Sequence, residues 1–157
     1  FVGRHPFFLG WGDILAAENE YQRLFSHFSE GSYEGVMLLE PVENPQNGAA
    51  MTLVGERVVS LVEKPAEAIA PWNQAGLSVY TQSIFSALKT ISLSKRGELE
   101  FTAAVQRSID QGAFIAGLPM QTPRLHLTRS EDIPIVEKVL AEDPRYAPSI
   151  AQFARDD

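Results

Sequence analysis

Several charged residues of this sequence stand where predicted strands end. Asp13 follows Gly12 directly after the apolar run at 6–11. A carboxylate behind a buried strand, beside a glycine that lets a ligand approach, is a common way to hold Mg²⁺ next to phosphate oxygens. The structural alternative is an aspartate that serves as a turn residue or a helix cap. Asp13 is therefore a candidate metal ligand.

Glu63 and Lys64 end another predicted strand, at 57–64, directly before Pro65. The residue before a proline avoids the helical region, so we expect Lys64 to be extended. Its ammonium group could neutralise a phosphate, and Glu63 could accept hydrogen bonds from sugar hydroxyls. Charged residues of this kind are also typical of an ordinary solvated strand end.

Arg96 and Glu98 flank Gly97 at the entrance of a helix that is predicted over 98–111. An arginine at a helix entrance can clamp a phosphate group. The alternative is a plain surface arginine.

A corner between a strand and a helix is predicted at 123–133, PRLHLTRSEDI, with Ser130 as the helix cap. In open α/β sheets such corners face the ligand crevice, and a carboxylate or a glycine is common there when phosphates and metals are handled. This corner carries His126 and Arg129 instead. It could be the edge of an active site, the remains of one, or a surface turn.

The spacing of apolar residues predicts the elements that must hold these side chains. Strands are predicted at 6–11, 35–42, 48–54, 57–64, 75–81, 113–119 and 124–128, and helices at 18–28, 82–91, 98–111 and from Ser130 onward. A two-residue turn at Gly55 and Glu56 would join two of the strands as a hairpin. This order indicates a Rossmann-like, layered α/β domain with a mixed, mostly parallel sheet.

The region 1–141 is predicted to form one partial domain, and 142–157 is polar enough for a tail or linker. Strand-like residues come almost at once and no methionine begins the sequence, so we expect it to be a fragment of a longer polypeptide. The sheet would then be missing its first strands and would have an unpaired edge. We therefore predict stable folding only with the missing N-terminal segment or a partner chain, with a homo-oligomer as one form of the latter.

Composition narrows the class of protein. With 13 basic and 20 acidic residues the net charge is −7, which argues against nucleic acid as a partner because that affinity requires basic residues. No apolar run reaches the length of a membrane span. The chain has no cysteine, which fits a reducing compartment, and we expect a cytoplasmic location.

Six segments in register resemble the sugar-phosphate nucleotidyltransferase family, of which glucose-1-phosphate thymidylyltransferase is a member. They are PFFLGWGDIL, EYQRLF, PVENPQNGAAMTLVGERVVSLVEKP, QAGLSVYTQSIFSAL, KRGELEFTAAVQRSIDQG and RLHLTRSEDIPIVEKVL. The similarity covers residues 1 to about 141, which would be the sugar-phosphate-binding part of the catalytic domain. Such enzymes make a nucleotide sugar and pyrophosphate from a nucleoside triphosphate and a sugar 1-phosphate.

The resemblance implies catalytic roles for three residues. Asp13 would bind Mg²⁺ beside the triphosphate, Lys64 would pair with the sugar phosphate, and Arg96 would be a further phosphate contact. A second set would bind substrate: Gly48, Glu63, Lys64, Gly76 and Glu98. The implied reaction is in-line attack of a phosphate oxygen on the α-phosphorus, which requires cationic stabilisation more than an acid or a base.

The chain also departs from the family. Members open with a glycine-rich Gly-Thr-Arg signature and a downstream lysine, which are not found here. Their Trp-x-Asp-x-Gly-Thr corner, whose Asp is the second metal ligand, aligns with residues 124–129. His126 therefore takes the position of that Asp. An imidazole is a poor substitute for a carboxylate there, because Mg²⁺ prefers oxygen ligands. Further differences fall at Asn47, Gln74, Ala103 and Thr128.

Three hypotheses follow. The chain is part of an active nucleotidyltransferase, although alone we expect it to be inactive. Alternatively, it is a catalytically degenerate member that acts as a sugar-nucleotide-binding or regulatory subunit. In the third hypothesis, the chain shares only its fold with the family and has an unrelated function.

Overall fold

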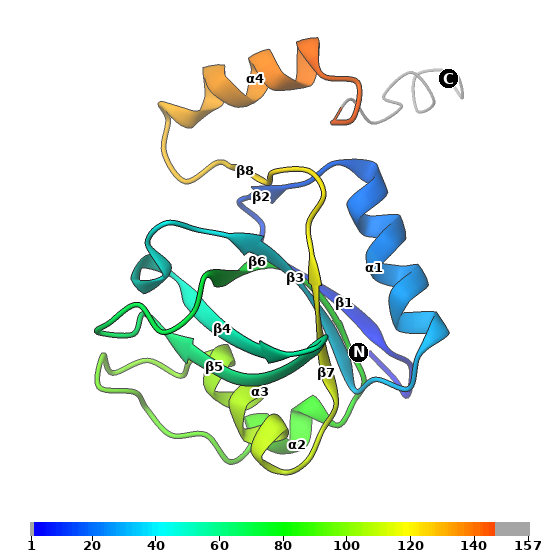
Figure 1. Ribbon diagram of the computed structural model, residues 1–157, viewed down its shortest axis with the longest axis vertical. Helices are drawn as coiled ribbons and strands as arrows, with labels where there is room; N and C mark the ends of the chain where they lie inside the picture. The colour runs from blue at the N-terminus through cyan, green and yellow to red at the C-terminus, as the bar shows by residue number, and fades with distance from the viewer. Residues whose placement is uncertain (1, 147–157) are drawn as a thin grey trace.

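The computed structural model describes residues 2–146, and six strands form its central sheet in the order β1-β6-β3-β7-β5-β4 (Figure 1). They are β1 (Phe7–Gly10), β3 (Gly35–Pro41), β4 (Ala49–Val54), β5 (Arg57–Glu63), β6 (Trp72–Tyr80) and β7 (Ile115–Pro119). Two short strands, β2 (Ile14–Leu15) and β8 (Leu125–His126), pair with each other outside this sheet.

The predicted α/β class and the mixed sheet are confirmed. The expectation of a mostly parallel sheet is wrong, because within residues 2–146 only the pairing of β3 with β7 is parallel. Parallel neighbours need a crossover of many residues, whereas a two-residue turn joins antiparallel strands. Gly55 and Glu56 form such a turn between β4 and β5, as the sequence predicts.

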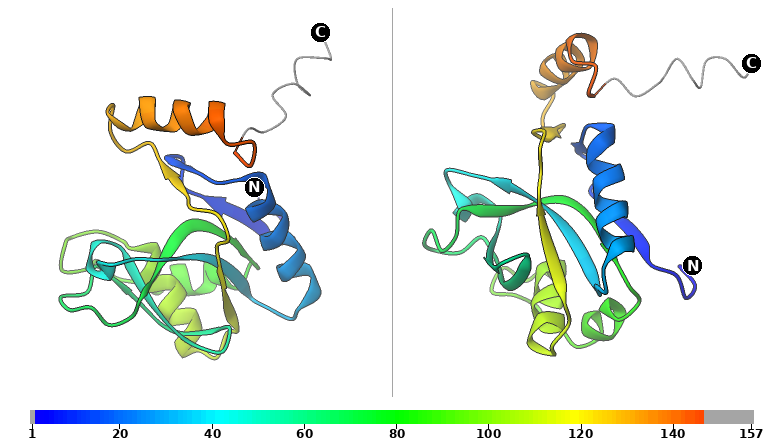
Figure 2. Two further views of the ribbon diagram at one scale, coloured as in Figure 1. Left: turned by 45° about the horizontal axis from the view of Figure 1, so that its top comes forward. Right: turned by 45° about the vertical axis from the view of Figure 1, so that its right-hand side comes forward.

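Helices cover both faces of the sheet (Figures 1 and 2). On one face, α1 (Glu18–Glu30) packs against β3 and β6; on the other, α2 (Ile84–Leu88) and α3 (Phe101–Asp110) enclose a second apolar cluster. The last helix, α4 (Asp132–Glu142), lies beyond the β2–β8 pair and away from the sheet. The fold therefore has three layers, with the β2–β8 pair at one end of the sheet.

Helix α1 forms because its apolar residues recur at helical spacing. Leu24 is fully buried against the sheet, a contribution of about 2 kcal/mol for a leucine side chain. Phe25 is 45% exposed and packs instead against Phe8 of β1, with ring centroids 5.9 Å apart. The helix ends at Glu30, two residues beyond the predicted end, and Gly31 is its C-cap residue.

Two elements begin elsewhere than the sequence predicts. Strand β6 starts at Trp72 rather than at residue 75, which extends it toward the end of β3. Helix α3 starts at Phe101 rather than at residue 98, because a turn over 94–98 comes first. In that turn the Ser94 N–H donates to the Glu98 carbonyl at 2.8 Å.

The predicted helix cap at Ser130 is wrong. Helix α4 begins at Asp132, and no side chain caps it from the N-cap position. The Asp132 carboxylate instead accepts the backbone N–H groups of Thr128 and Arg129, at 2.9 and 2.8 Å. A carboxylate forms stronger hydrogen bonds than a hydroxyl, which explains why it organises this corner.

The start of the predicted polar tail is packed against the domain. Tyr146 is buried, and its hydroxyl donates to the Pro123 carbonyl; the Arg145 carbonyl accepts the Glu18 N–H at 3.4 Å. The remainder of that predicted tail lies outside the described residues. Among the helices of residues 2–146, none has the length and apolar character to span a membrane.

Candidate functional site

A hollow of about 470 Å³ opens where β3 ends and β6 begins, and it is called the polar pocket below. Its lining comprises Glu40, Val42, Glu43, Asn44, Asn47, Gly48, Asn73, Arg124 and His126. These residues come from the end of β3, the loop before β4, the start of β6, and the β8 segment. Amides, carboxylates and one guanidinium thus face a shared space, which is suited to a ligand with many hydroxyl groups.

An ion pair between Arg124 and Glu40 forms one wall of the polar pocket. The two side chains are only 10% and 19% exposed, and Arg124 Nη1 also donates to the Gln74 carbonyl at 3.4 Å. Sequence reasoning did not single out this pair, because its members are far apart in the chain. The pair joins the segment before β8 to the end of β3.

Asp13 and His126 meet at the corner that β2 and β8 form. Ile14 pairs with His126, and the Leu127 N–H donates to the Asp13 carbonyl at 2.8 Å. Burial, and after it the charge of Arg124, lowers the pKa of His126, against the smaller opposing effects of Glu40, Asp13 and Asp132. The imidazole is therefore mainly neutral at pH 7.

Lys64 is hydrogen-bonded to Gly48, which lines the polar pocket. The Lys64 N–H donates to the Gly48 carbonyl at 2.9 Å. The expectation of an extended Lys64 is wrong: its φ is +43°, and it is the sole non-glycine residue of the described chain with a positive φ. Such strain occurs disproportionately at functional sites. A Cβ atom on Gly48 would lie 2.6 Å from Asn73 Nδ2, so glycine here leaves room for that amide.

Arg96, Glu63 and Glu98 are also brought together. The Arg96 guanidinium lies 2.9 Å from Glu98 Oε2, 3.0 Å from Glu100 Oε1 and 4.0 Å from Glu63 Oε1. Glu100 was not predicted, although its spacing of four residues from Arg96 was a usable signal. The carboxylates neutralise the guanidinium, so an incoming phosphate must displace at least one of them to bind Arg96.

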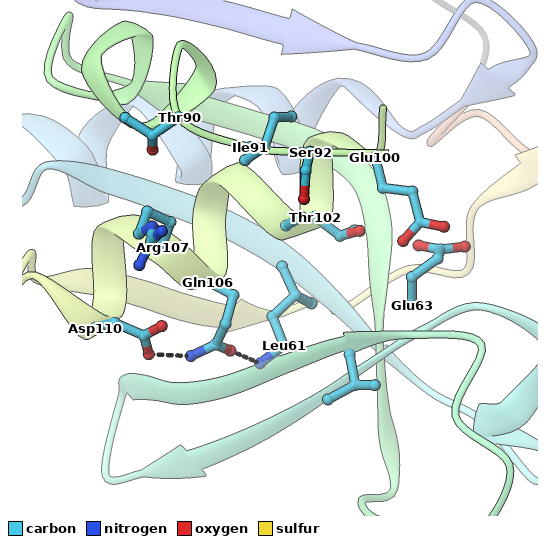
Figure 3. A pocket seen from close by; sticks show the side chains of 12 residues that line it. Leu61, Glu63, Thr90, Ile91, Ser92, Glu100, Thr102, Gln106, Arg107 and Asp110 are labelled. Carbon is cyan, nitrogen blue, oxygen red and sulfur yellow. Dashed lines mark hydrogen bonds between the residues drawn. The ribbon is translucent and has the colours of Figure 1, made fainter. Parts of the chain in front are cut away.

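A second hollow, of about 410 Å³, lies between β5 and α3 on the other side of Glu63 (Figure 3). The carboxylates of Glu63 and Glu100 point toward each other there, and Gln106 bridges the two elements. Gln106 Oε1 accepts the Leu61 N–H at 2.6 Å, and its Nε2 donates to Asp110 at 2.8 Å. The hydrogen bond to Leu61 holds α3 against β5.

Gly76 packs closely against residues 11–14 of the same chain. Its φ is +83°, its carbonyl accepts the Trp11 N–H at 3.0 Å, and a Cβ would lie 3.1 Å from both the Trp11 ring and Ile14. The β3–β6 register shifts at this point. Gly76 thereby allows residues 11–13 to cross β6 and brings Asp13 to the β2–β8 corner.

The predicted site residues lie at and between two hollows: Gly48 and His126 line the polar pocket, and Glu63 lines the second hollow. Asp13 stands beside His126, the Gly48 carbonyl accepts the Lys64 N–H, and Glu63 lies 4.0 Å from Arg96. Six of the predicted residues are together called the rim: Asp13, Gly48, Glu63, Lys64, Arg96 and Glu98. Gly76 is hydrogen-bonded to Trp11, two residues before Asp13.

Magnesium binding can be tested against the donor atoms present. No three His, Asp, Glu or Cys side chains of residues 2–146 are grouped closely enough to hold a metal ion. Asp13 offers one partly exposed carboxylate, which makes no hydrogen bond to another described side chain. Mg²⁺ is commonly held by one or two carboxylates together with substrate phosphates and water. The residues therefore fit an ion that arrives with its substrate, rather than one held by protein alone.

The Arg124 charge is expected to set the protonation of His126. In Arg124→Met, the charge that lowers the pKa of His126 is removed and Glu40 loses its partner, so the pKa should rise toward its ordinary value. A pH titration of the His126 ring protons by NMR measures this. Arg129→Met is the control and should leave the pKa unchanged; an unchanged value in both variants contradicts the described geometry.

The fold and the site define a class of protein, an α/β domain whose polar pocket is lined and flanked by cationic and carboxylate side chains. The family description "Nucleotidyl transferase" matches residues 2–120. The chain therefore belongs to the nucleotidyltransferase family, and specifically to its sugar-phosphate branch, as the six sequence segments indicated.

Two curated relatives illustrate the relationship. The low-salt glycan biosynthesis nucleotidyltransferase of Haloferax volcanii is 32% identical over 146 residues, which cover 91% of this chain and 40% of the relative. The glucose-1-phosphate thymidylyltransferase of Streptomyces antibioticus is 36% identical over 86 residues, 54% of this chain and 24% of that protein. The chain spans two fifths or less of the length of these relatives.

Solved structures share the fold. A putative glucose-1-phosphate thymidylyltransferase from Bacillus anthracis has a TM-score of 0.75 at 20% identity, over 90% of this chain and 57% of that one. The UDP-glucose pyrophosphorylase from Acinetobacter baumannii has a TM-score of 0.74 at 16% identity, over 98% of this chain and 57% of that one. At these identities the likeness supports the fold alone.

Proposed function

We propose that this chain supplies the sugar 1-phosphate side of a nucleotidyltransferase. The whole protein would form a nucleotide sugar and pyrophosphate from a nucleoside triphosphate and a sugar 1-phosphate. The observation that carries the proposal is a polar pocket lined by Gly48, whose carbonyl is hydrogen-bonded to Lys64, with Glu63 next to Lys64 in the sequence and paired with Arg96, in a chain of this family.

The reaction is a displacement at phosphorus. An oxygen of the sugar phosphate forms a bond to the α-phosphorus of the triphosphate, and the bond from that phosphorus to the oxygen bridging to the β-phosphorus breaks. Pyrophosphate leaves with the electron pair. Two anions must approach each other, so positioning and cationic stabilisation supply most of the catalysis.

Lys64 is proposed to hold the sugar phosphate. Its backbone is fixed in the left-handed region by the hydrogen bond to Gly48, and its exposed side chain makes no ion pair within the described residues. Arg96 is proposed as a second phosphate contact that exchanges Glu98 or Glu100 for the substrate. Because the guanidinium lies between several carboxylates, it can exchange one of them for the phosphate while it stays paired with another.

The sugar itself is proposed to lie in the polar pocket. Glu63 and Glu98, which lie beside Arg96 and outside the lining of that pocket, would accept sugar hydroxyl groups from the side of the Arg96 loop. The Gly48 carbonyl, which already accepts the Lys64 N–H, has a second lone pair for a sugar hydroxyl. The Asn73 amide adds a donor and an acceptor on the same wall.

Magnesium is proposed to arrive with the triphosphate, and Asp13 would be its protein ligand. The ion would shield phosphate charge when bound. His126 is not assigned as a ligand, because its neutral imidazole lies near the Arg124 charge and Mg²⁺ prefers oxygen.

Nucleotidyl transfer is favoured over the binding-only alternative because the relatives described above are transferases. A further segment of polypeptide, or a partner chain, is proposed to pair with β1, which lies at one edge of the sheet with Phe8 40% exposed. The lack of cysteine is consistent with work in the cytoplasm.

Sugar 1-phosphate binding tests this function. The complete polypeptide should bind at least one sugar 1-phosphate in calorimetric titration, and Glu63→Gln should weaken that binding about 10-fold, because a charge-assisted hydrogen bond to a sugar hydroxyl is lost. The matched control is Glu67→Gln, an exposed carboxylate in the following loop, which should leave binding unchanged. Equal affinities in both variants, or no binding by the wild type, would count against the proposal.

A further inference from the structure

A buried carboxylate outside the rim has no assigned role. Glu20 lies in the first turn of α1 and is 0% exposed. Its Oε1 atom accepts three hydrogen bonds, from the Gln121 N–H and the Thr122 N–H at 2.8 Å each and from the Thr122 hydroxyl at 2.9 Å. Arg23 Nη1 donates to Oε2 at 2.6 Å.

The segment that Glu20 holds leads into the polar pocket. Residues 120–124 connect β7 to β8 and belong to no helix or strand. The Met120 N–H donates to the carbonyl of Leu39, the residue before Glu40. Two residues beyond Thr122 stands Arg124, whose guanidinium pairs with Glu40, and His126 follows. The backbone at 121–122 therefore determines where the Arg124 wall stands.

Packing alone does not account for a carboxylate at this position. Glu20 precedes Leu24 by one helical turn, so it occupies the buried face of α1, where an apolar residue would ordinarily lie. A buried charge is costly unless hydrogen bonds compensate it. Here one oxygen accepts three hydrogen bonds from two adjacent residues of an irregular segment, which is the arrangement of an anchor for that segment.

We propose that Glu20 is a positioning residue of the site: it fixes the backbone at 121–122 and thereby holds Arg124 against Glu40 at the wall of the polar pocket. Arg23 supports the anchor from outside, because its Nη2 donates at 3.0 Å to the carbonyl of Pro119, the last residue of β7 before this connection. The effect on ligand binding rests on the proposed function, whereas the effect on the backbone does not.

Two substitutions of similar size separate anchoring from packing. Glu20→Gln retains a carbonyl oxygen that can accept the same donors, whereas Glu20→Met fills the space without an acceptor. In the full chain, hydrogen exchange of the Gln121 and Thr122 amides should accelerate about 10-fold or more in Glu20→Met and clearly less in Glu20→Gln. The amide of Leu24 serves as the internal reference for global opening. Ser26→Ala, at an exposed position of the same helix, is the control and should leave exchange at 121–122 unchanged.

The second readout is the affinity for the sugar 1-phosphate that the wild type binds. Glu20→Met should weaken it about 10-fold, with Glu20→Gln closer to wild type. If the wild type binds no sugar 1-phosphate, the proposed function fails, and the exchange rates still test the anchor. If Glu20→Met does not fold, Thr122→Val removes the hydroxyl donor alone and should accelerate exchange at 121–122 to a smaller extent.

Two results would overturn the proposal. In the first, the amides at 121–122 exchange at the wild-type rate in Glu20→Met or, where that variant does not fold, in Thr122→Val. In the second, Glu20→Gln and Glu20→Met are affected equally and only in step with the Leu24 reference, which would indicate a contribution to global stability without local positioning.

Discussion

Replacing Lys64 with methionine is expected to lower kcat/KM for pyrophosphate formation about 100-fold or more while the fold stays intact. Removal of one preorganised charge-stabilising group from an active site has an effect of this size. Lys64 is exposed and has no ion pair within residues 2–146, so methionine removes the ammonium group and little else. Steady-state kinetics of pyrophosphate release, with the sugar 1-phosphate varied, measure the loss.

Two further variants make this result specific. Lys89→Met removes an exposed lysine at the end of α2, which is not one of the rim residues, and should leave kcat/KM unchanged. Lys64→Gly also removes the ammonium group but relieves the strain of a φ of +43°, so it should be as inactive as Lys64→Met. Wild-type activity in Lys64→Met would show that the lysine has no part in binding the sugar phosphate.

Replacing Gly76 with valine is expected to lower the free energy of unfolding by about 3 kcal/mol or more. A φ of +83° is unfavourable for any residue with a Cβ and is worst for a β-branched one. The added carbon would also lie 3.1 Å from the Trp11 ring and from Ile14, so neighbouring side chains must move. Urea denaturation followed by tryptophan fluorescence measures the change.

The control for this substitution is Gly12→Ala. A Cβ on Gly12 meets no atom within 4 Å, and its φ lies outside the left-handed region. Its unfolding free energy should stay within about 0.5 kcal/mol of the wild type, as is usual for surface substitutions. If Gly76→Val unfolds at the wild-type urea concentration, the crossing of residues 11–13 over β6 is not held as described, and neither is the position of Asp13.

Local patterns in the sequence predict much of the fold. The apolar spacing of α1 and the two-residue turn between β4 and β5 depend on neighbouring residues, and both are confirmed. Strand direction is different, because it depends on which distant strands pair. The placement of β6 between β1 and β3, antiparallel to both, makes the sheet mainly antiparallel in this region, and no short stretch of sequence encodes that choice.

The site residues also divide into those that local sequence patterns predict and those that depend on long-range contacts. The Lys64–Pro65 strand end and the Arg96 loop were visible as motifs, and Glu100 was within reach of the same reasoning. The pair of Arg124 with Glu40 was not, because it joins two segments more than 80 residues apart. The sequence signal for Glu20 is weaker: it is a charged residue one turn before Leu24 on the apolar face of a helix. Its partners at 121–122 appear only in the folded structure.

These observations describe a site assembled from two sides. On one side, the end of β5 carries Glu63 and Lys64, and Arg96 lies 4.0 Å from Glu63 in the loop before α3. Gln106 of α3 accepts a hydrogen bond from β5. The other side is the β2–β8 corner and the Arg124 wall, whose connection to β7 is held by Glu20. Because the second side depends on long-range contacts, mutations there should affect substrate affinity through backbone position, whereas mutations on the first side should remove a contact directly.

Release of pyrophosphate is the direct test of nucleotidyl transfer to a sugar 1-phosphate. The complete polypeptide that contains these 157 residues would be assayed with Mg²⁺ and a panel of nucleoside triphosphates and sugar 1-phosphates. At least one pair is expected to yield pyrophosphate and a nucleotide sugar in equal amounts, with release that requires both substrates. Absence of release for every pair, from folded protein, would contradict the proposed transfer.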